Sequence, residues 1–351
     1  MGFVTILFGN GLGRAVDNAY FSLQTGIQSV WNDPADVVLT AANKRLVLQC
    51  LPDPKPLMPS SEDELETIHQ VIRACNFLNE VEQNNPIPLW LTEGGRDFPG
   101  VTQHFIGKVA NYFHECPNFP NAYIDFVNSL VGFIGSYDTH IATLNYDNLL
   151  YQPLIEAGIL DGYNGHLLDG FTGTPLTFRE TNMHRRRHNA HLGWYLHLHG
   201  SPLFFSNGRD VCKMHQPDLA ISFNDRPILN RHIVLAHTRI KPEIISGSSL
   251  LSSYWDFFRR ALDETATIIV FGYGGYDTHV NRQINDWVTA NKTSGRNINL
   301  IVIERLDPAV ANTTRISDWK NLLDVDSRLG PTEFELKRLN NVLDLDWKTA
   351  F

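Results

Sequence analysis

Three polar side chains follow the apolar run of residues 141–144 and begin a stretch with helical spacing. They are Asn145, Tyr146 and Asp147. Asp147 fits a helix N-cap, because its carboxylate can accept hydrogen bonds from the free N–H groups of a first helical turn. In open α/β sheets, however, ligands bind outside the carboxyl ends of the strands. The segment is therefore a candidate binding or catalytic site, with helix capping as the alternative for Asp147.

Two glycine-rich turns each follow an apolar run. GNGLGR (residues 9–14) follows residues 4–8, and FGYGGYD (271–277) ends a second run. Glycines at the start of a helix let a phosphate approach the backbone N–H groups. The first turn has G-x-G-x-G spacing, which differs from the dinucleotide-binding G-x-G-x-x-G pattern, so a plain tight turn is the alternative. Two such turns favour a dinucleotide ligand, although Asp277 also fits a helix cap.

The segment YLHLHGS (residues 195–201) places two histidines two residues apart. In a strand, such residues share one face, and paired imidazoles can bind a metal when carboxylates join them. Asp147 or Asp277 are candidate partners, but no sequence pattern selects either. In the other interpretation, His199 is a general base at the end of a strand and Gly200 leaves room for a substrate. For His197 a structural role is the preferred interpretation.

Composition narrows the function classes. The 351-residue chain has a formal net charge of −9, which argues against a general binder of nucleic acids or anionic membranes. The basic run HRRRH (184–188) is the local exception; we interpret it as a solvated loop, with a phosphate or partner contact as the alternative. No apolar stretch is long enough to span a bilayer. The cysteines form no CxxC pair, so we expect reduced thiols and a cytoplasmic protein: Cys50, Cys75, Cys116 and Cys212.

Apolar runs alternate with helical patterns along the chain. This predicts an α/β fold, a Rossmann-like parallel sheet covered by helices, with a mostly helical inserted module. Strands are expected at residues 4–8, 35–40, 140–144, 194–199, 233–236, 266–271 and 298–304. Helices are expected at 14–30, after Asp147, at 248–265 and at 278–290. The Rossmann-like domain would span 1–60 and 136–330, the helical insert 61–135, and a C-terminal helix or tail 331–351.

Four motifs in this order resemble the sirtuin motif series. They are Gly9-Asn10-Gly11-Leu12-Gly13, Thr143-Leu144-Asn145-Tyr146-Asp147, Leu198-His199-Gly200 and Gly272-Tyr273-Gly274. Sirtuins carry Gly-Ala-Gly-x-Ser, Thr-Gln-Asn-Ile-Asp, Leu-His-Gly and Gly-Thr-Ser. The Gly-Tyr-x-x-x-Asp pattern at residues 272–277 is closer to the bacterial sirtuin-like domains of anti-phage defence proteins. The resemblance covers the α/β parts of the chain and leaves out the helical insert.

The chain departs from sirtuin deacylases in several ways. It lacks their two CxxC pairs, so no zinc is expected, and it has Leu144 in place of Gln and Gly13 in place of Ser. No segment is recognisable as a channel for an acyl-lysine peptide. These departures argue against protein deacylation. The resemblance to defence enzymes instead implies an NAD hydrolase that releases nicotinamide and ADP-ribose.

The resemblance also implies roles for individual residues. Asn145 would hold the nicotinamide ribose and the attacking water, Asp147 would orient the nicotinamide side or the Asn145 loop, and His199 would be the general base. Glu304 would bind the adenine ribose, with a solvated charge at the end of a strand as the alternative. The residues expected to bind NAD are Gly9, Asn10, Gly11, Gly13, Thr143, Gly200, Gly272, Tyr273, Gly274, Asp277 and Glu304.

Three rival functions are compatible with the sequence. They are a sirtuin-type deacylase, a non-catalytic NAD- or ADP-ribose-binding module, and a metallohydrolase using His197 and His199. For a defence enzyme we expect inactivity until a trigger arrives, because uncontrolled loss of NAD kills the host cell. The resemblance implies a homo-oligomer, with a co-encoded, ring-shaped ATPase of the DNA-translocase kind as a candidate partner. Direct binding of nucleic acid or a membrane is not expected.

Overall fold

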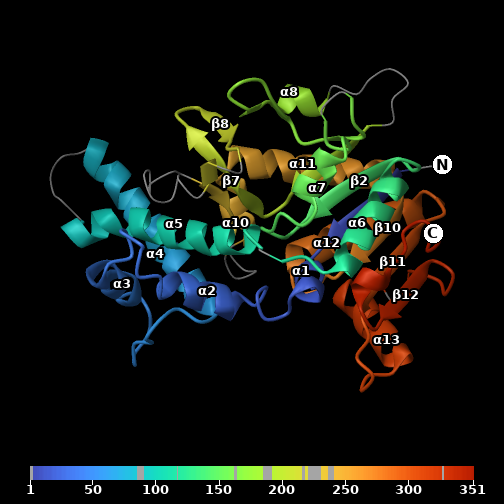
Figure 1. Ribbon diagram of the computed structural model, residues 1–351, viewed down its shortest axis with the longest axis horizontal. Coiled ribbons are helices and arrows are strands. Elements are labelled where there is room, and N and C mark those ends of the chain that lie inside the picture. Colours follow the sequence, from blue (N-terminus) through green and yellow to red (C-terminus); the bar gives the residue numbers. More distant parts are fainter. Residues whose placement is uncertain are drawn as a thin grey trace.

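The fold is built around a parallel β-sheet. Among the described residues of the computed structural model, seven strands form this sheet in the order β12-β11-β10-β1-β2-β6-β3, each parallel to its neighbours (Figure 1). The strands are β1 (Phe3–Phe8), β2 (Thr139–Thr143), β3 (Leu167–Leu168), β6 (Gly193–His197), β10 (Thr265–Phe271), β11 (Asn299–Arg305) and β12 (Phe334–Leu339). The structure describes residues 3–84, 91–116, 118–161, 164–184, 192–215, 218–219, 231–235, 241–325 and 328–351.

Helices cover this sheet, as the alternating apolar pattern predicts. Helix α11 (Ser249–Glu264) packs against β1 and β6 with an apolar face that repeats every three to four residues and includes Leu251, Trp255 and Phe258. The Oγ atom of Ser248 caps this helix by accepting a hydrogen bond from the N–H of Leu251 at 3.2 Å. The predicted Rossmann-like parallel sheet with helical cover is thus confirmed. Among the described helices, none is long and apolar enough to cross a membrane.

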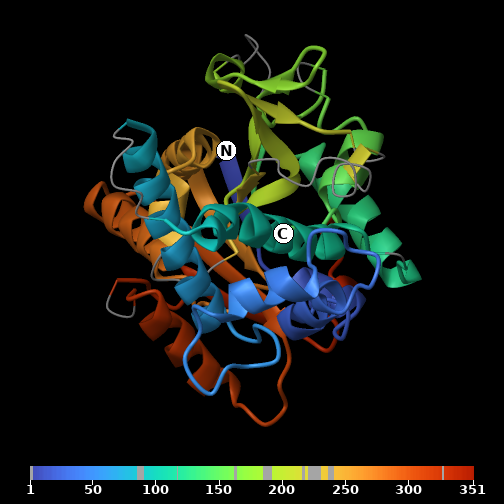
Figure 2. The same cartoon turned by 90° about the vertical axis from the view of Figure 1, so that its left-hand side faces the viewer.

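Helices α2, α3, α4 and α5 lie together at one end of the molecule (Figures 1 and 2). Helix α5 packs against α2, α3 and α4 beside the main sheet, and α6 lies against the C-terminal 3-10 turn (Val342–Asp344). Helices α4, α5 and α6 confirm the predicted helical segment. The helices are α1 (Gly11–Val16), α2 (Leu23–Trp31), α3 (Ala41–Leu48), α4 (Glu62–Asn84), α5 (Glu93–His114), α6 (Asn121–Ile134), α7 (Tyr151–Glu156), α8 (Glu180–Met183), α10 (Lys241–Ser246), α11 (Ser249–Glu264), α12 (Thr278–Thr293) and α13 (Asn312–Leu322).

A second, antiparallel sheet stands beside the first. Within the described residues it has the strand order β4-β5-β8-β7-β9, with strands Phe171–Thr172, Thr177–Phe178, Asp210–Lys213, Gly200–Asn207 and Arg231–Ile233. Lys213 of β8 joins it to the main fold, because its Nζ lies 2.8 Å from Asp169 Oδ2 and 2.7 Å from the Tyr151 hydroxyl. The sequence predicts loops for residues 161–193, and the short strands there were missed. Of the predicted strand at 233–236, Ala236 lies outside the described residues.

Two predictions in the N-terminal part are wrong. Residues 35–40 form a turn instead of a strand, because the carboxylate of Asp36 accepts hydrogen bonds from Val38, Leu39 and His104. The predicted helix at 14–30 is two helices, α1 and α2. Asp17 separates them, because its carboxylate accepts hydrogen bonds from the backbone N–H groups of Ala19 at 3.0 Å and Tyr20 at 2.9 Å. Such local bonds from an aspartate compete with regular structure.

The prediction of a C-terminal helix or tail at 331–351 is also wrong. Residues 334–339 form β12, the edge strand of the main sheet, which pairs in parallel with β11. The charges in FELKRL weaken its strand pattern, and charged side chains are common on edge strands. After the strand, Trp347 is fully buried against Phe8, Phe126 and Phe133. The C-terminal segment is therefore part of the core.

Gly193, at the start of β6, leaves no room for a side chain. A Cβ atom there would lie 1.7 Å from the carbonyl oxygen of Thr139 on β2. We expect Gly193→Ala to lower the free energy of unfolding by about 2–3 kcal/mol, because the two strands must move apart. Gly135→Ala at the end of α6 is the control, since its nearest neighbour would lie 3.5 Å away. Urea unfolding curves measure both, and equal stability of the two variants would contradict this packing.

Candidate functional site

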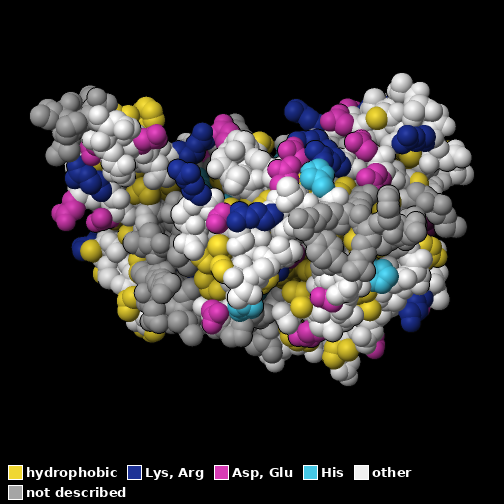
Figure 3. All heavy atoms as spheres, turned by 90° about the horizontal axis from the view of Figure 1, so that it is seen from above, with side chains coloured by type: hydrophobic (Ala, Val, Ile, Leu, Met, Phe, Trp, Pro, Cys, Tyr) yellow, Lys and Arg dark blue, Asp and Glu magenta, His cyan; other side chains and the backbone are white. Residues whose placement is uncertain are grey.

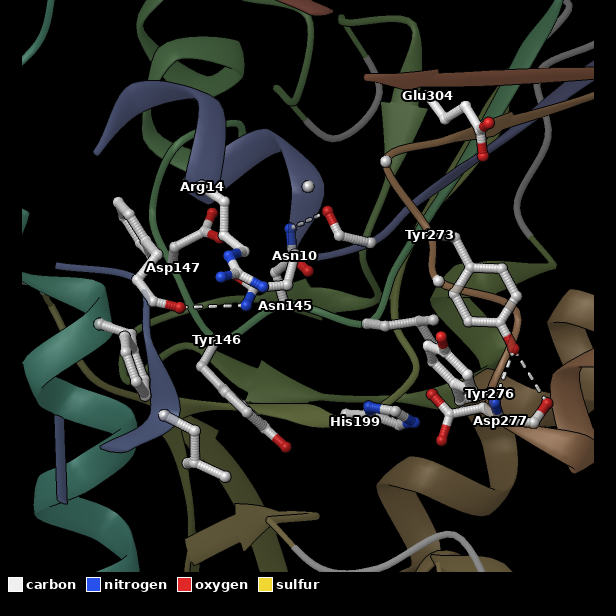
Figure 4. A pocket seen from close by; sticks show the side chains of 18 of the residues that line it. Asn10, Arg14, Asn145, Tyr146, Asp147, His199, Tyr273, Tyr276, Asp277 and Glu304 are labelled. Carbon is white, nitrogen blue, oxygen red and sulfur yellow. Dashed lines mark hydrogen bonds between the residues drawn. The ribbon is translucent and has the colours of Figure 1, made fainter. Parts of the chain in front are cut away.

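The order of the main sheet places a crevice at the end of β1. The next strand of the sheet along the chain, β2, pairs with one edge of β1, whereas β10 pairs with its other edge. Open α/β sheets bind ligands at such a switch point, outside the carboxyl ends of the strands. A cavity of about 510 Å³ lies there, within the usual range of ligand pockets (Figure 4).

Most of the predicted site residues line this cavity. They come from the ends of five strands and are Gly9, Asn10, Gly11, Asn145, Asp147, His199, Gly272, Tyr273, Gly274, Asp277 and Glu304. The chain thus brings together residues that are nearly 300 positions apart in sequence. The lining also includes Tyr146 of the predicted segment and residues to which the sequence assigned no role, among them Arg14, Lys241, Tyr276 and Arg305.

Three predicted NAD-binding residues support the cavity instead of lining it. A Cβ atom on Gly13 would lie 2.7 Å from the Phe21 ring, so this glycine allows α1 to pack closely. The Thr143 hydroxyl accepts a hydrogen bond from the backbone N–H of Asn145 at 3.1 Å. Gly200 has a φ of +82° and abuts the carbonyl of His232. A direct contact of these three residues with a ligand finds no support in the geometry.

The two glycine turns contact each other through their backbones. The N–H of Gly11 donates to the carbonyl of Gly272 at 2.7 Å, and the N–H of Gly9 donates to the carbonyl of Phe271 at 2.9 Å. A Cβ atom on Gly11 would lie 2.6 Å from the Gly272 Cα. Close packing of β1 and β10 therefore already requires glycine at both turns. A phosphate contact at these turns stays a prediction.

The side chain of Asn145 is held in place at the edge of the cavity. Its Nδ2 atom donates to the carbonyl of Gly9 at 3.1 Å, and the residue is only 6% exposed. A second hydrogen bond joins its amide to the carboxyl group of Asp147. This side chain therefore links the first glycine turn to the segment after β2 and presents an amide with a defined orientation (Figure 4).

Asp147 is buried and does not cap a helix. Its Oδ1 atom accepts a hydrogen bond from the N–H of Leu149 at 3.1 Å, whereas α7 begins only at Tyr151. The capping alternative is therefore wrong; the residue holds a local turn. Burial raises the pKa of Asp147 to about 7, although hydrogen bonds from Leu149 and Asn145 oppose this rise. Its carboxyl group thus changes charge near neutral pH.

His199 and His197 lie in different surroundings. His199 lines the cavity, and its Nε2 has no hydrogen-bond partner among the described residues. Burial, followed by the charge of Lys241, lowers the pKa of His199 well below its usual value, so its imidazole is neutral at neutral pH. His197, the last residue of β6, instead packs against the rings of Tyr151, Tyr195 and Phe204. Its predicted structural role agrees with this packing, and a shared metal site of the two histidines does not.

The second glycine turn carries a network around Asp277. Lys241 Nζ lies 2.6 Å from Asp277 Oδ1, and both residues are buried. The hydroxyl of Tyr273 accepts a hydrogen bond from the Asp277 N–H at 2.9 Å and lies 2.9 Å from Asn281 Oδ1. The carboxylate of Asp277 makes no cap bond to α12, so the capping alternative for this residue is wrong. No motif around Lys241 indicates this pairing in the sequence.

Glu304, at the carboxyl end of β11, is not a solvated charge. Its carboxylate accepts hydrogen bonds from Arg315 Nε at 3.0 and 2.9 Å and from Trp319 Nε1 at 2.8 Å. Arg338 Nε lies 3.3 Å away as a further ion-pair partner. The carboxylate lines the cavity but is already held by two arginines. Its contact with a ribose stays a prediction.

No protein-family model and no curated protein sequence matches this chain.

The molecular surface, seen from above relative to the view of Figure 1, carries interspersed basic and acidic side chains (Figure 3). Of the basic run at 184–188, residues 185–188 lie outside the described residues.

Proposed function

We propose that this chain is an NAD hydrolase that cleaves the nicotinamide–ribose bond and releases nicotinamide and ADP-ribose. One observation carries the proposal. A single cavity at the switch point of the sheet collects both glycine turns, the fixed amide of Asn145 and the neutral imidazole of His199. Residues from all four of the motifs that resemble the sirtuin series therefore line one cavity.

The chemistry needs a positioned water and a proton acceptor. Cleavage of an N-glycosidic bond passes through an oxocarbenium-like transition state, as glycoside hydrolysis does. In the proposed reaction the Asn145 amide holds the ribose and the water that attacks C1′. The C1′–N bond breaks, nicotinamide leaves as a neutral molecule, and the water proton passes to Nε2 of His199. This nitrogen is available because it has no other partner among the described residues.

The remaining lining fits the rest of a dinucleotide. The backbone of residues 9–11 and the guanidinium of Arg14 border the cavity where we place the pyrophosphate. Residues 272–274 would line the adenosine half. Tyr276 lies at the rim with 77% of its surface exposed, so its ring is free to stack on a base.

The resemblance extends the proposal to a biological role. A defence effector of this kind depletes NAD during infection and causes abortive infection, so it is held inactive until triggered. We propose that a homo-oligomer provides this control, with a co-encoded ring-shaped ATPase as its candidate partner. A cytoplasmic location belongs to the same proposal.

A second candidate is a non-catalytic module that binds NAD or ADP-ribose. The strong burial of His199 favours it, because an imidazole whose pKa lies well below its usual value is a weak proton acceptor. The two functions share the same cavity and differ only in turnover.

Incubation of the purified chain with NAD tests the proposal. Chromatography should show nicotinamide and ADP-ribose appearing in equal amounts, and Asn145→Ala should lower the rate at least about 100-fold while leaving the fold intact. Calorimetry with NAD separates binding from turnover. If NAD binds but is not consumed, with or without the co-encoded partner, the binding module replaces the hydrolase.

A further inference from the structure

We propose that His199, Asp277 and His279 form a binding site for a divalent transition-metal ion such as Zn²⁺. Each of these residues offers one ligand atom, and the three atoms lie within 4.8 Å of one another. His199 follows β6, whereas Asp277 and His279 lie at the start of α12. The site is thus formed only when β6 and β10 lie in the same sheet.

Unpaired nitrogens point to a missing partner in this cluster. Nε2 of His199 and both ring nitrogens of His279 are buried and have no hydrogen-bond partner among the described residues. A buried polar atom without a hydrogen-bond partner destabilises the folded state, so such atoms normally have one. A neutral imidazole has a lone pair on one nitrogen, which is the atom that binds a metal.

The set of donors suits Zn²⁺ or a similar ion. Two imidazoles and one carboxylate form the protein ligands of many zinc and iron sites, with further positions left to water or substrate. Zn–N bonds measure about 2.0–2.1 Å, so tetrahedral ligands lie about 3.3 Å apart and these side chains must move closer by rotation. Because His199 and Asp277 line the cavity, an open coordination position would face it.

Groups next to the three residues affect how the cluster can bind a metal ion. The His279 ring packs against Trp255 with 4.9 Å between ring centroids, and its centroid lies 5.7 Å from that of His199. Lys241 already binds Oδ1 of Asp277, which leaves Oδ2 for the metal. The ammonium group also repels a cation. We therefore expect removal of the Lys241 charge to strengthen metal binding.

Metal binding would also affect catalysis, and this part of the inference rests on the proposed hydrolase function. A metal on Nε2 of His199 would occupy the lone pair that accepts the proton from water. Zn²⁺ would then inhibit NAD turnover. The metal site itself does not depend on this activity.

The test uses the full chain without a polyhistidine tag, after treatment with a chelator. Titration with Co²⁺, followed by its d–d absorption, and with Zn²⁺ by calorimetry should show one ion per chain. His279→Gln and Asp277→Asn should each weaken binding at least about 10-fold, whereas Lys241→Met should tighten it. His184→Gln is the matched control, because His184 is exposed on α8's C-terminal side and outside the cluster.

The outcomes separate the metal site from the hydrolase. Circular dichroism of each variant serves as the control for folding. A stoichiometric Co²⁺ spectrum that His279→Gln removes supports the site, even if NAD is never hydrolysed. No Co²⁺ band in the wild type, or equal affinity in His279→Gln and His184→Gln, would overturn the site and leave the hydrolase standing if NAD is consumed.

Discussion

His199→Gln is expected to lower NAD turnover about 10²–10⁴-fold, the usual contribution of a positioned general base. Glutamine keeps a polar side chain of similar size but cannot accept the proton from the attacking water. The effect should fall on kcat more than on KM, because the imidazole acts on the water and leaves the phosphate and adenosine contacts unchanged.

His197→Gln is the matched control for this prediction. His197 lies two residues away and is as buried as His199, but it packs on aromatic rings outside the cavity. We expect His197→Gln to reduce stability while each folded molecule keeps nearly full turnover. Steady-state kinetics and thermal unfolding of both variants are the measurements. Equal losses of kcat in the two variants would mean that His199 has only a structural role.

Asp147→Asn is expected to remove a pH dependence of stability. Burial raises the pKa of Asp147 from 3.8 to about 7, which corresponds to about 4 kcal/mol between the two protonation states. Between pH 4 and pH 7 the folded protein keeps a proton that the unfolded chain loses. The favourable contribution is therefore complete below about pH 4 and is lost as the pH rises through about 7.

An asparagine at position 147 cannot ionise, so the variant should gain stability relative to the wild type as the pH rises. The gain between pH 4 and pH 8 should approach about 4 kcal/mol, measured by urea unfolding at several pH values. Asp125→Asn is the control, because this residue is exposed on the surface of α6. A wild type and an Asp147→Asn variant with parallel pH curves would show that the carboxyl group is solvated in the native state.

The main sheet is readily predicted from the sequence because its central strands are apolar throughout. Strands buried on both faces, such as β1 and β10, produce short runs of branched apolar residues that end in glycines. Weakly patterned elements were not predictable in the same way. β12 carries charges, and the strands of the second sheet are mostly short; their stability comes from partners distant in the sequence.

The candidate site shows the same division. Asn145, His199 and both glycine turns were identified because they follow recognisable strands, and parallel strands place their carboxyl ends at one edge. Lys241 and His279 lie in segments without a motif. They became part of the site only through contacts with Asp277 and His199. Glu304 was predicted to bind the adenine ribose, with a solvated charge as the alternative. Its arginine partners come from α13 and β12, and the sequence pattern does not reveal them.

By itself, the sequence determined the class of fold and the polar residues at the strand ends, because hydrophobic periodicity and glycine turns are local properties. The tertiary structure alone decided which of these residues share a cavity, which are occupied by ion pairs, and how burial changes their charge. Asp147 and His199 illustrate the reason. Their types are visible in the sequence, but their protonation depends on the desolvation and neighbouring charges that only packing creates.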